Sequence, residues 1–254
     1  MRTDRLINVI DENIEVTTQD GTADAILYRD ADGRPHPGVL LLTDIGGIRP
    51  ATRDMARRLA STGYTVLMPN VFYRTARPPL FDFPRTPGDA ATMKRFGELS
   101  APMTPEAMER DGAAYVDYLS HHAAVAGEPL AVVGYCFTGA MALRTAAVRA
   151  DTVVAAASFH GGGLATDAPT SPHHLLPRIK ARLYFGHAVD DRTMPADAIA
   201  KLDAALGAWG GRHESEVYEK AHHSWTVSDS PVYNPQQADR AFAKLTALLG
   251  ETLT

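Results

Sequence analysis

The chain has 254 residues, of which 45% are hydrophobic, so it is long enough to bury a substantial core. Its 25 basic and 30 acidic residues give a net charge of −5, which excludes the basic surface typical of nucleic-acid binding. We therefore expect a small molecule, and not a nucleic acid, as its partner.

The cysteine count and the lack of long apolar runs indicate a cellular location. Cys136 is the only cysteine, so no disulfide can form within the chain, as is typical of a reducing compartment. No run approaches the ~18 apolar residues of a membrane-spanning helix, and residues 1–12 lack the features of a signal peptide. We expect a cytoplasmic protein with no membrane partner. Monomer and homodimer both remain open.

The first part of the chain has the pattern of a sheet with an antiparallel start. Asp20-Gly21 is a hairpin signal between two short apolar-alternating segments. Strand, helix and strand then follow in an order that implies a right-handed crossover and parallel strands. The predicted elements are strands at residues 14–19, 23–28, 38–42 and 64–68, and a helix at 49–61.

Between residues 71 and 105 this regular pattern lapses, and we name the segment the excursion. Six prolines interrupt it, and only residues 89–99 have helical spacing. A long irregular segment inside a compact domain is usually functional, although an ordinary surface insertion has the same pattern. We predict that the excursion forms a lid.

The remainder of the chain returns to alternating strands and helices, with a loop at residues 169–177. Strands are predicted at residues 130–133, 153–158, 182–186 and 214–218, and helices at 106–121, from 137 onward, at 195–209 and at 235–249. We therefore predict a single α/β domain over residues 1–254, with one doubly wound, mostly parallel sheet and an antiparallel N-terminal hairpin.

The most informative stretch is Gly-Tyr-Cys-Phe-Thr-Gly at residues 134–139. It joins a buried strand to a helix, which is the setting of a nucleophile elbow with Cys136 as the nucleophile. Gly134 and Gly139 would let the strand and the helix pass close to one another. The alternative is a buried structural cysteine at a strand-to-helix junction.

Two later strands deliver further reactive groups, because the carboxyl ends of parallel strands meet at one edge of a sheet. One is followed by Asp190 and Asp191, and the next by His222 and His223. Nucleophile, acid and histidine thus occur in the chain order of hydrolases that use an elbow. Histidine can take the thiol proton and aspartate can orient the imidazole. Alternatively, the carboxylates cap the following helix and the histidines are solvated.

The loop after the strand at residues 38–42 supplies two further groups. The backbone N–H of Ile45, together with that of Phe137 at a helix N-terminus, would form an oxyanion hole. Asp44 lies beside them. We predict that its carboxylate contacts the resting thiol or its histidine, with helix capping as the alternative.

On these residues the chain resembles the dienelactone hydrolase family, whose members have an α/β-hydrolase fold and use cysteine in place of the usual serine. The resemblance covers residue 38 to the closing helix and depends on four motifs, at residues 63–70, 134–139, 191–195 and 218–225. It implies Cys136, Asp191 and His223 as the catalytic triad, because the family's acid lies four residues before a proline and its histidine directly precedes serine and an aromatic residue. It also implies Ile45 and Phe137 as oxyanion donors.

The chain departs from the family's pattern at three places. Asp44 stands where the family typically has a glutamate that is thought to activate the thiol, and Thr138 replaces the second glycine of the elbow. The arginine that holds a substrate carboxylate in dienelactone-specific members is missing after His223. Arginines or lysines of the excursion are the candidates to replace it: Arg74, Arg77, Lys94 and Arg95.

We therefore predict a hydrolase of carboxylic esters or lactones that forms a thioester with Cys136 and needs no metal or cofactor. Predicted substrate contacts, in addition to the triad, are Tyr73, Arg74, Arg95, Tyr135, His160 and Trp225. Two alternatives remain: a non-catalytic binding protein with the same fold, and an acyltransferase or phosphotriesterase that uses the same nucleophile.

Overall fold

The computed structural model describes residues 8–86 and 88–253. Residues 1–7, used above to judge targeting, and Pro87 of the excursion lie outside these ranges. Within them, no helix combines the length and the apolar character that crossing a membrane requires.

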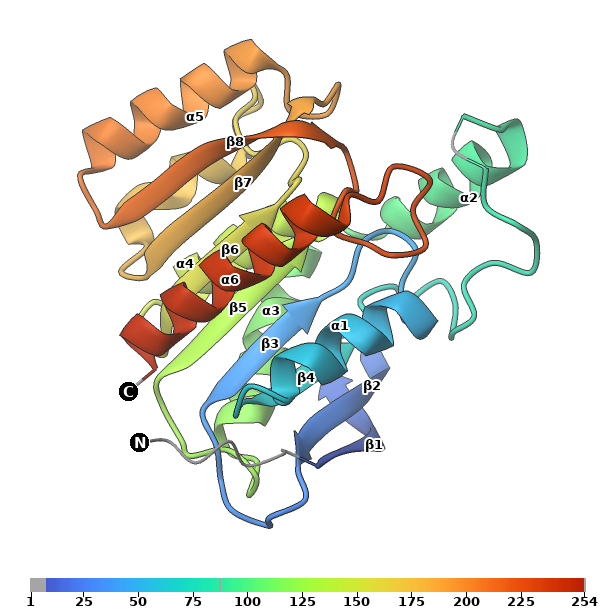
Figure 1. Cartoon of the computed structure of the whole chain (residues 1–254), viewed down its shortest axis with the longest axis vertical. Coiled ribbons are helices and arrows are strands. Elements are labelled where there is room, and N and C mark those ends of the chain that lie inside the picture. Colours follow the sequence, from blue (N-terminus) through green and yellow to red (C-terminus); the bar gives the residue numbers. More distant parts are fainter. Residues whose placement is uncertain (1–7, 87, 254) are drawn as a thin grey trace.

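The described residues form an eight-stranded sheet in the order β1-β2-β4-β3-β5-β6-β7-β8 (Figure 1). Its first two pairings, β1 with β2 and β2 with β4, are antiparallel, and all later pairings are parallel. This confirms the predicted sheet and its antiparallel start. The strands are β1 (Val9–Thr18), β2 (Gly21–Asp30), β3 (Gly38–Leu42), β4 (Thr65–Pro69), β5 (Leu130–Tyr135), β6 (Val153–Phe159), β7 (Arg182–Asp190) and β8 (His213–His222).

Helices cover both faces of the sheet. In Figure 1, α1 and α6 lie in front of it and α3 and α4 behind it. The described helices are α1 (Pro50–Ala60), α2 (Ala90–Ser100), α3 (Pro105–Ser120), α4 (Gly139–Val148), α5 (Ala196–Trp209) and α6 (Pro235–Thr252), with short 3-10 turns η1 (Cys136–Thr138) and η2 (Pro172–Arg178). The second of these turns lies where the sequence predicts only loop.

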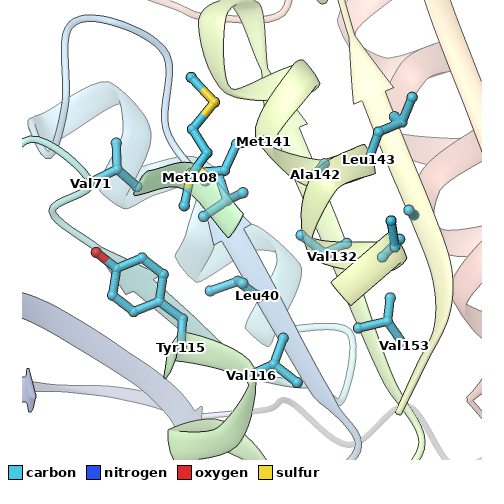
Figure 2. Close-up of a cluster of buried hydrophobic side chains, with 14 of the residues drawn as sticks. Leu40, Val71, Met108, Tyr115, Val116, Val132, Met141, Ala142, Leu143 and Val153 are labelled. Carbon is cyan, nitrogen blue, oxygen red and sulfur yellow. The ribbon is translucent and has the colours of Figure 1, made fainter. Parts of the chain in front are cut away.

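Because helices cover both faces of the sheet, the central strands are unbroken apolar runs in the sequence. Side chains alternate along a strand, so Leu40 packs in the cluster on the α3 and α4 side, while Leu41 packs on the α1 and α6 side. Figure 2 shows part of the first of these clusters, to which Val132 of β5 and Met141 and Leu143 of α4 all belong. All five residues of β3 are buried. The chain can hold these strands in the middle of the sheet because both of their faces are apolar.

Several strands are longer than the sequence predicts, and this decides where the reactive residues lie. β7 runs to Asp190 and β8 to His222, whereas the expected strands end at residues 186 and 218. Asp191 and His223 therefore follow directly on the last strand residues. At the other end of the chain, the hairpin turn lies at residues 19 and 20, because Thr18 pairs with Gly21.

The excursion contains α2, as predicted, with Asp89 accepting a hydrogen bond from the Thr92 backbone N–H at 3.1 Å. Its first residues are fastened to the body of the protein. Arg74 forms two hydrogen bonds, of 2.6 and 2.8 Å, to the carboxylate of Asp111 on α3, and a third of 2.6 Å to Asp20 in the hairpin turn. Asp111 is completely buried. That this segment acts as a lid stays a prediction.

We expect Arg74→Met to lower the free energy of unfolding by about 3–5 kcal/mol, because it leaves the buried Asp111 carboxylate without its cation. Urea denaturation of the wild type and the variant measures this difference. Arg77→Met is the matched control, since Arg77 is exposed and lies 3.6 Å from the exposed Glu15. Equal losses in the two variants would contradict the structural role of Arg74.

Candidate active site

Cys136 lies at a sharp turn between β5 and α4. Its φ is +57°, a value that non-glycine residues rarely adopt. A Cβ on Gly134 would collide with the carbonyl oxygen of Thr138, and a Cβ on Gly139 would lie 2.8 Å from the Cα of Gly161. The predicted need for small residues on both sides of the turn is thus confirmed by the packing. Cys136 itself is partly exposed.

The imidazole of His223 lies between the cysteine and a carboxylate. Its Nε2 is 2.9 Å from Cys136 Sγ, and its Nδ1–H donates to Asp191 Oδ2 at 2.6 Å. Asp191 is buried, and its other oxygen accepts hydrogen bonds from the backbone N–H and the hydroxyl of Thr193 at 2.8 and 2.7 Å. The structure therefore brings three side chains from three strand ends into one hydrogen-bonded line.

The other member of each candidate pair lies elsewhere. Asp190 and His222 are both exposed, and they face each other as the last paired residues of β7 and β8. Side chains alternate along a strand, so consecutive residues at its end leave on opposite sides. The choice of Asp191 and His223 implied by the family resemblance agrees with this geometry.

These contacts shift the pKa values of His223 and Asp191. Burial by itself lowers the pKa of His223, but hydrogen bonds to Asp191 and to the Cys136 sulfur outweigh it and raise that pKa to about 10. Burial raises the pKa of Asp191, and the hydrogen bonds from His223 and Thr193 outweigh this and hold that pKa below its usual value. The arrangement favours the imidazolium form of His223 beside the Asp191 carboxylate. The form of a cysteine that attacks is its thiolate.

Thr138, which replaces a glycine of the family's elbow, joins the two segments that carry the predicted oxyanion donors. Its buried hydroxyl donates to the carbonyl oxygen of Leu42 at 2.9 Å and accepts from the Tyr135 N–H at 3.0 Å. It thereby joins the end of β3, which leads to Ile45, to the turn that carries Phe137. The Phe137 N–H lies in the first turn of η1, where helical N–H groups have no partner within the helix. The oxyanion role of both N–H groups stays a prediction.

The hydrogen bonds of Asp44 match neither of the two expected roles. Its carboxylate accepts two hydrogen bonds from the guanidinium of Arg49, at 2.6 and 2.8 Å, and one from the Gly46 N–H at 2.9 Å. Among the described residues it has no hydrogen bond to Cys136 or His223, and the residue at the N-cap of α1 is Arg49. The hydrogen bonds of the Asp44 carboxylate go to Arg49 and Gly46, so they do not support the predicted contact with the thiol or its histidine, which stays a prediction.

Three of the predicted substrate contacts are bound by other groups of the protein. The Tyr73 hydroxyl is hydrogen-bonded to Thr18 at 2.6 Å, and Arg74 is bound by carboxylates, as described above. Arg95 donates to the carbonyl oxygen of Leu80 at 2.9 Å and to Glu98 at 3.0 Å. These interactions hold the excursion in place, so the geometry does not support a role for the three side chains in binding substrate.

The other three predicted contacts are buried behind the reactive line. Tyr135 is stacked on Phe159, with ring centroids 5.6 Å apart, and Trp225 is completely buried. His160 is also buried, with its ring centroid 5.3 Å from that of His223 and its Nε2 2.7 Å from the Thr226 hydroxyl. Burial and the neighbouring His223 hold the pKa of His160 well below its ordinary value, so this ring is neutral. The His160 ring packs against the ring of His223 on its buried side.

Sequence reasoning did not single out Arg49, Arg85 or Asp229. The carboxylate of Asp229 accepts hydrogen bonds from Arg49 Nε at 2.7 Å and from Arg85 Nη2 at 3.1 Å. The only available signal was that an acidic residue follows His223 where the family has an arginine. The excursion thus reaches this region through Arg85, and not through any of the four cations considered above.

Metal-type ligands come together elsewhere in the described part of the chain. Carboxylate oxygens of Asp30 and Asp32 and a ring nitrogen of His36 lie within 4.8 Å of one another in the turn before β3. The turn is at the opposite end of β3 from Ile45, and Asp32 is also paired with Arg34 at 2.8 Å. This cluster takes no part in the site around Cys136.

A family model described as the dienelactone hydrolase family matches residues 23–253. The chain belongs to the dienelactone hydrolase family. A carboxymethylenebutenolidase from Rhodococcus opacus is 28% identical over 217 residues, which are 84% of this chain and 79% of that protein. Membership supports an enzyme that hydrolyses esters or lactones.

Solved structures agree in fold. A dienelactone hydrolase-like promiscuous phosphotriesterase from metagenomic libraries has a TM-score of 0.80 at 20% identity, covering 97% of this chain and 99% of its own. Dienelactone hydrolase from Anabaena variabilis has a TM-score of 0.69 at 17% identity, with the same coverage of 97% and 99%. At these identities the matches show the fold alone, and they confirm the predicted α/β-hydrolase architecture.

The raised pKa of His223 gives a prediction for stability. A group whose pKa is higher in the folded state contributes stability that is complete below its ordinary pKa of 6.5 and is lost as the pH rises through about 10. We expect the unfolding free energy of the wild type to fall relative to that of His223→Gln between pH 6.5 and 10. Urea denaturation at several pH values tests this, and parallel curves for the two proteins would contradict it.

Proposed function

We propose that the protein hydrolyses a small carboxylic ester or lactone, with Cys136, His223 and Asp191 as its catalytic triad. The observation that carries the proposal is the line from Cys136 Sγ through His223 to Asp191, with contacts of 2.9 and 2.6 Å. Membership of a hydrolase family and the partial exposure of Cys136 support the same conclusion.

In the proposed first step, the thiolate of Cys136 attacks the carbonyl carbon of the substrate. The negative charge that develops on the carbonyl oxygen is stabilised by the N–H groups of Ile45 and Phe137. His223 then gives its proton to the leaving alkoxide, and a thioester with Cys136 is formed. For a lactone, the leaving hydroxyl group stays attached to the acyl group.

In the second step, His223 removes a proton from a water molecule that attacks the thioester. The acid is released, the sulfur leaves as the thiolate, and His223 holds the proton that the water gave up. Asp191 keeps the Nδ1–H of the imidazole in place and stabilises its cationic form throughout. The cycle requires only water besides the substrate, so we propose no metal and no cofactor.

We further propose that substrates without a carboxylate are preferred. The residue expected to bind a substrate carboxylate is absent after His223, and the two nearby guanidinium groups, of Arg49 and Arg85, share the carboxylate of Asp229. A substrate anion would have to compete with this internal carboxylate. A lone reactive thiol also favours a reducing compartment, which supports the cytoplasm as the place of action.

A second activity, phosphotriester cleavage by the same thiolate, is favoured by one observation. The structural relative with a TM-score of 0.80 is described as a promiscuous phosphotriesterase. A non-catalytic binding role is less well supported, because all three triad side chains are in hydrogen-bonding contact. An assay with a 4-nitrophenyl dialkyl phosphate distinguishes the phosphotriesterase from the esterase.

We expect Cys136→Ala and His223→Gln to lower kcat/KM for 4-nitrophenyl acetate by at least about 10³-fold, because each removes a member of the triad. His222→Gln and Asp190→Asn are matched controls that change the neighbouring residue of the same type, and we expect both to keep wild-type rates. Initial rates of the purified, folded variants test this. Full activity of Cys136→Ala, or equal effects of His222→Gln and His223→Gln, would refute the proposed triad.

A further inference from the structure

Four charged side chains form a compact group beside the predicted oxyanion hole: Asp44, Arg49, Arg85 and Asp229, which we name the charge quartet. They come from the loop after β3, the start of α1, the excursion and the loop after β8. Figure 1 shows the loops before α1 and before α6 on the same side of the molecule. The ion pair between Arg49 and Asp229 joins these two loops across 180 residues of sequence.

Arg49 is the centre of the charge quartet, and every N–H of its guanidinium has an acceptor. Two hydrogen bonds go to Asp44, at 2.6 and 2.8 Å, and two go to Asp229, at 2.7 and 3.0 Å. The fifth goes to the carbonyl oxygen of Gly47 at 3.1 Å. The Arg49 side chain is only 13% exposed. A planar guanidinium can bind two carboxylates in this forked manner, which a lysine cannot do.

The position of Asp44 gives this arrangement a consequence for catalysis. Asp44 directly precedes Ile45, and its own carboxylate is held against the loop by the Gly46 N–H. A Cβ on Gly46 would collide with the guanidinium groups of Arg49 and Arg85, so both cations lie against this backbone. A buried carboxylate here without a cation would oppose the negative charge that forms on the substrate oxygen during attack.

We propose that Arg49 is a positioning residue for the oxyanion hole: it holds the Asp44 carboxylate against the loop and cancels its charge, and through Asp229 it fastens the loop that carries His223. The inference rests on the proposed function, because it concerns the oxyanion of that reaction. It also assigns Asp44 a new place in the mechanism. Asp44 is kept away from the thiol, and His223 is the partner that Cys136 retains before substrate binds.

The experiment measures kcat and KM for 4-nitrophenyl acetate in Arg49→Met, Asp44→Asn and the double variant. We expect Arg49→Met to lower kcat on the order of 10²-fold, comparable to the loss of one oxyanion donor, with KM changed by less than about threefold. Adding Asp44→Asn removes the uncompensated charge and should restore kcat by at least about tenfold. Arg57→Met is the matched control, since Arg57 is a partly exposed arginine of α1 that pairs with Asp11 and Asp54, and we expect wild-type rates.

Each outcome decides the inference. If kcat of Arg49→Met stays within about threefold of the wild type, or if Asp44→Asn restores nothing, Arg49 has at most a structural role. Circular dichroism shows which variants are folded. If Arg49→Met is not folded, Arg49→Lys and Arg49→Gln replace it: we expect a kcat at least about tenfold higher with lysine, which keeps the charge, and equal values overturn the inference.

Failure of this inference is distinguishable from failure of the proposed function. The wild type and Cys136→Ala are assayed in the same series. If the wild type is active and Cys136→Ala is inactive, the proposed triad stands, whatever the effect of Arg49→Met. If Cys136→Ala is as active as the wild type, the proposed function itself fails, and the effect of Arg49 then says nothing about an oxyanion formed by attack of this thiol.

Discussion

The hydrogen bonds of a single imidazole organise the reactive end of this protein. His223 contacts Cys136 Sγ at 2.9 Å and Asp191 at 2.6 Å, although the three residues lie far apart in sequence. Their meeting depends on the register of the sheet, in which Asp190 is paired with His222. The next residue of each strand leaves the sheet at the same place. Because the carboxyl ends of parallel strands lie at one edge of the sheet, residues that are far apart in the chain meet there and form the site.

Backbone geometry at the elbow is the second constraint, and it was largely predictable. The positive φ of Cys136 and the close passage of strand and helix require glycine at 134 and 139, and both positions were recognisable in the sequence. The positions of the central strands followed from the apolar runs, because strands buried on both faces are predominantly apolar. Thr138 was a different case. It looked like a weakness of the motif, yet its hydroxyl ties Leu42 to Tyr135.

The charge quartet could not be predicted, and the reason is physical. Both Arg49 and Arg85 pair with Asp229, which is distant from them in sequence, and ion pairs of this kind leave no periodic pattern. Arginines of the excursion were expected to face a substrate, but Arg74 and Arg95 are bound by groups of the protein itself. From its place beside the predicted oxyanion donors, Asp44 was expected to contact the thiol or its histidine. Its carboxylate is instead bound by Arg49, which lies only five residues later.

Charge balance around the thiol follows from these contacts. The imidazolium form of His223 is flanked by Asp191 and by the sulfur, the buried His160 is neutral, and the charge quartet contains two cations and two anions. The neighbourhood of the sulfur therefore has little net charge, which suits a neutral acyl group. Substrate selection and catalysis would then depend on the same residues, because Arg49 and Asp229 serve both.

The central claim is that the sulfur of Cys136 carries the acyl group during turnover. The most direct measurement is intact-mass and peptide mass spectrometry of enzyme quenched in acid within the first turnover of a slowly hydrolysed aryl ester. The account predicts an adduct of the acyl mass on the peptide that contains Cys136, which disappears at the rate of steady-state turnover. Product formation without an adduct, or with the adduct on another residue, would contradict it.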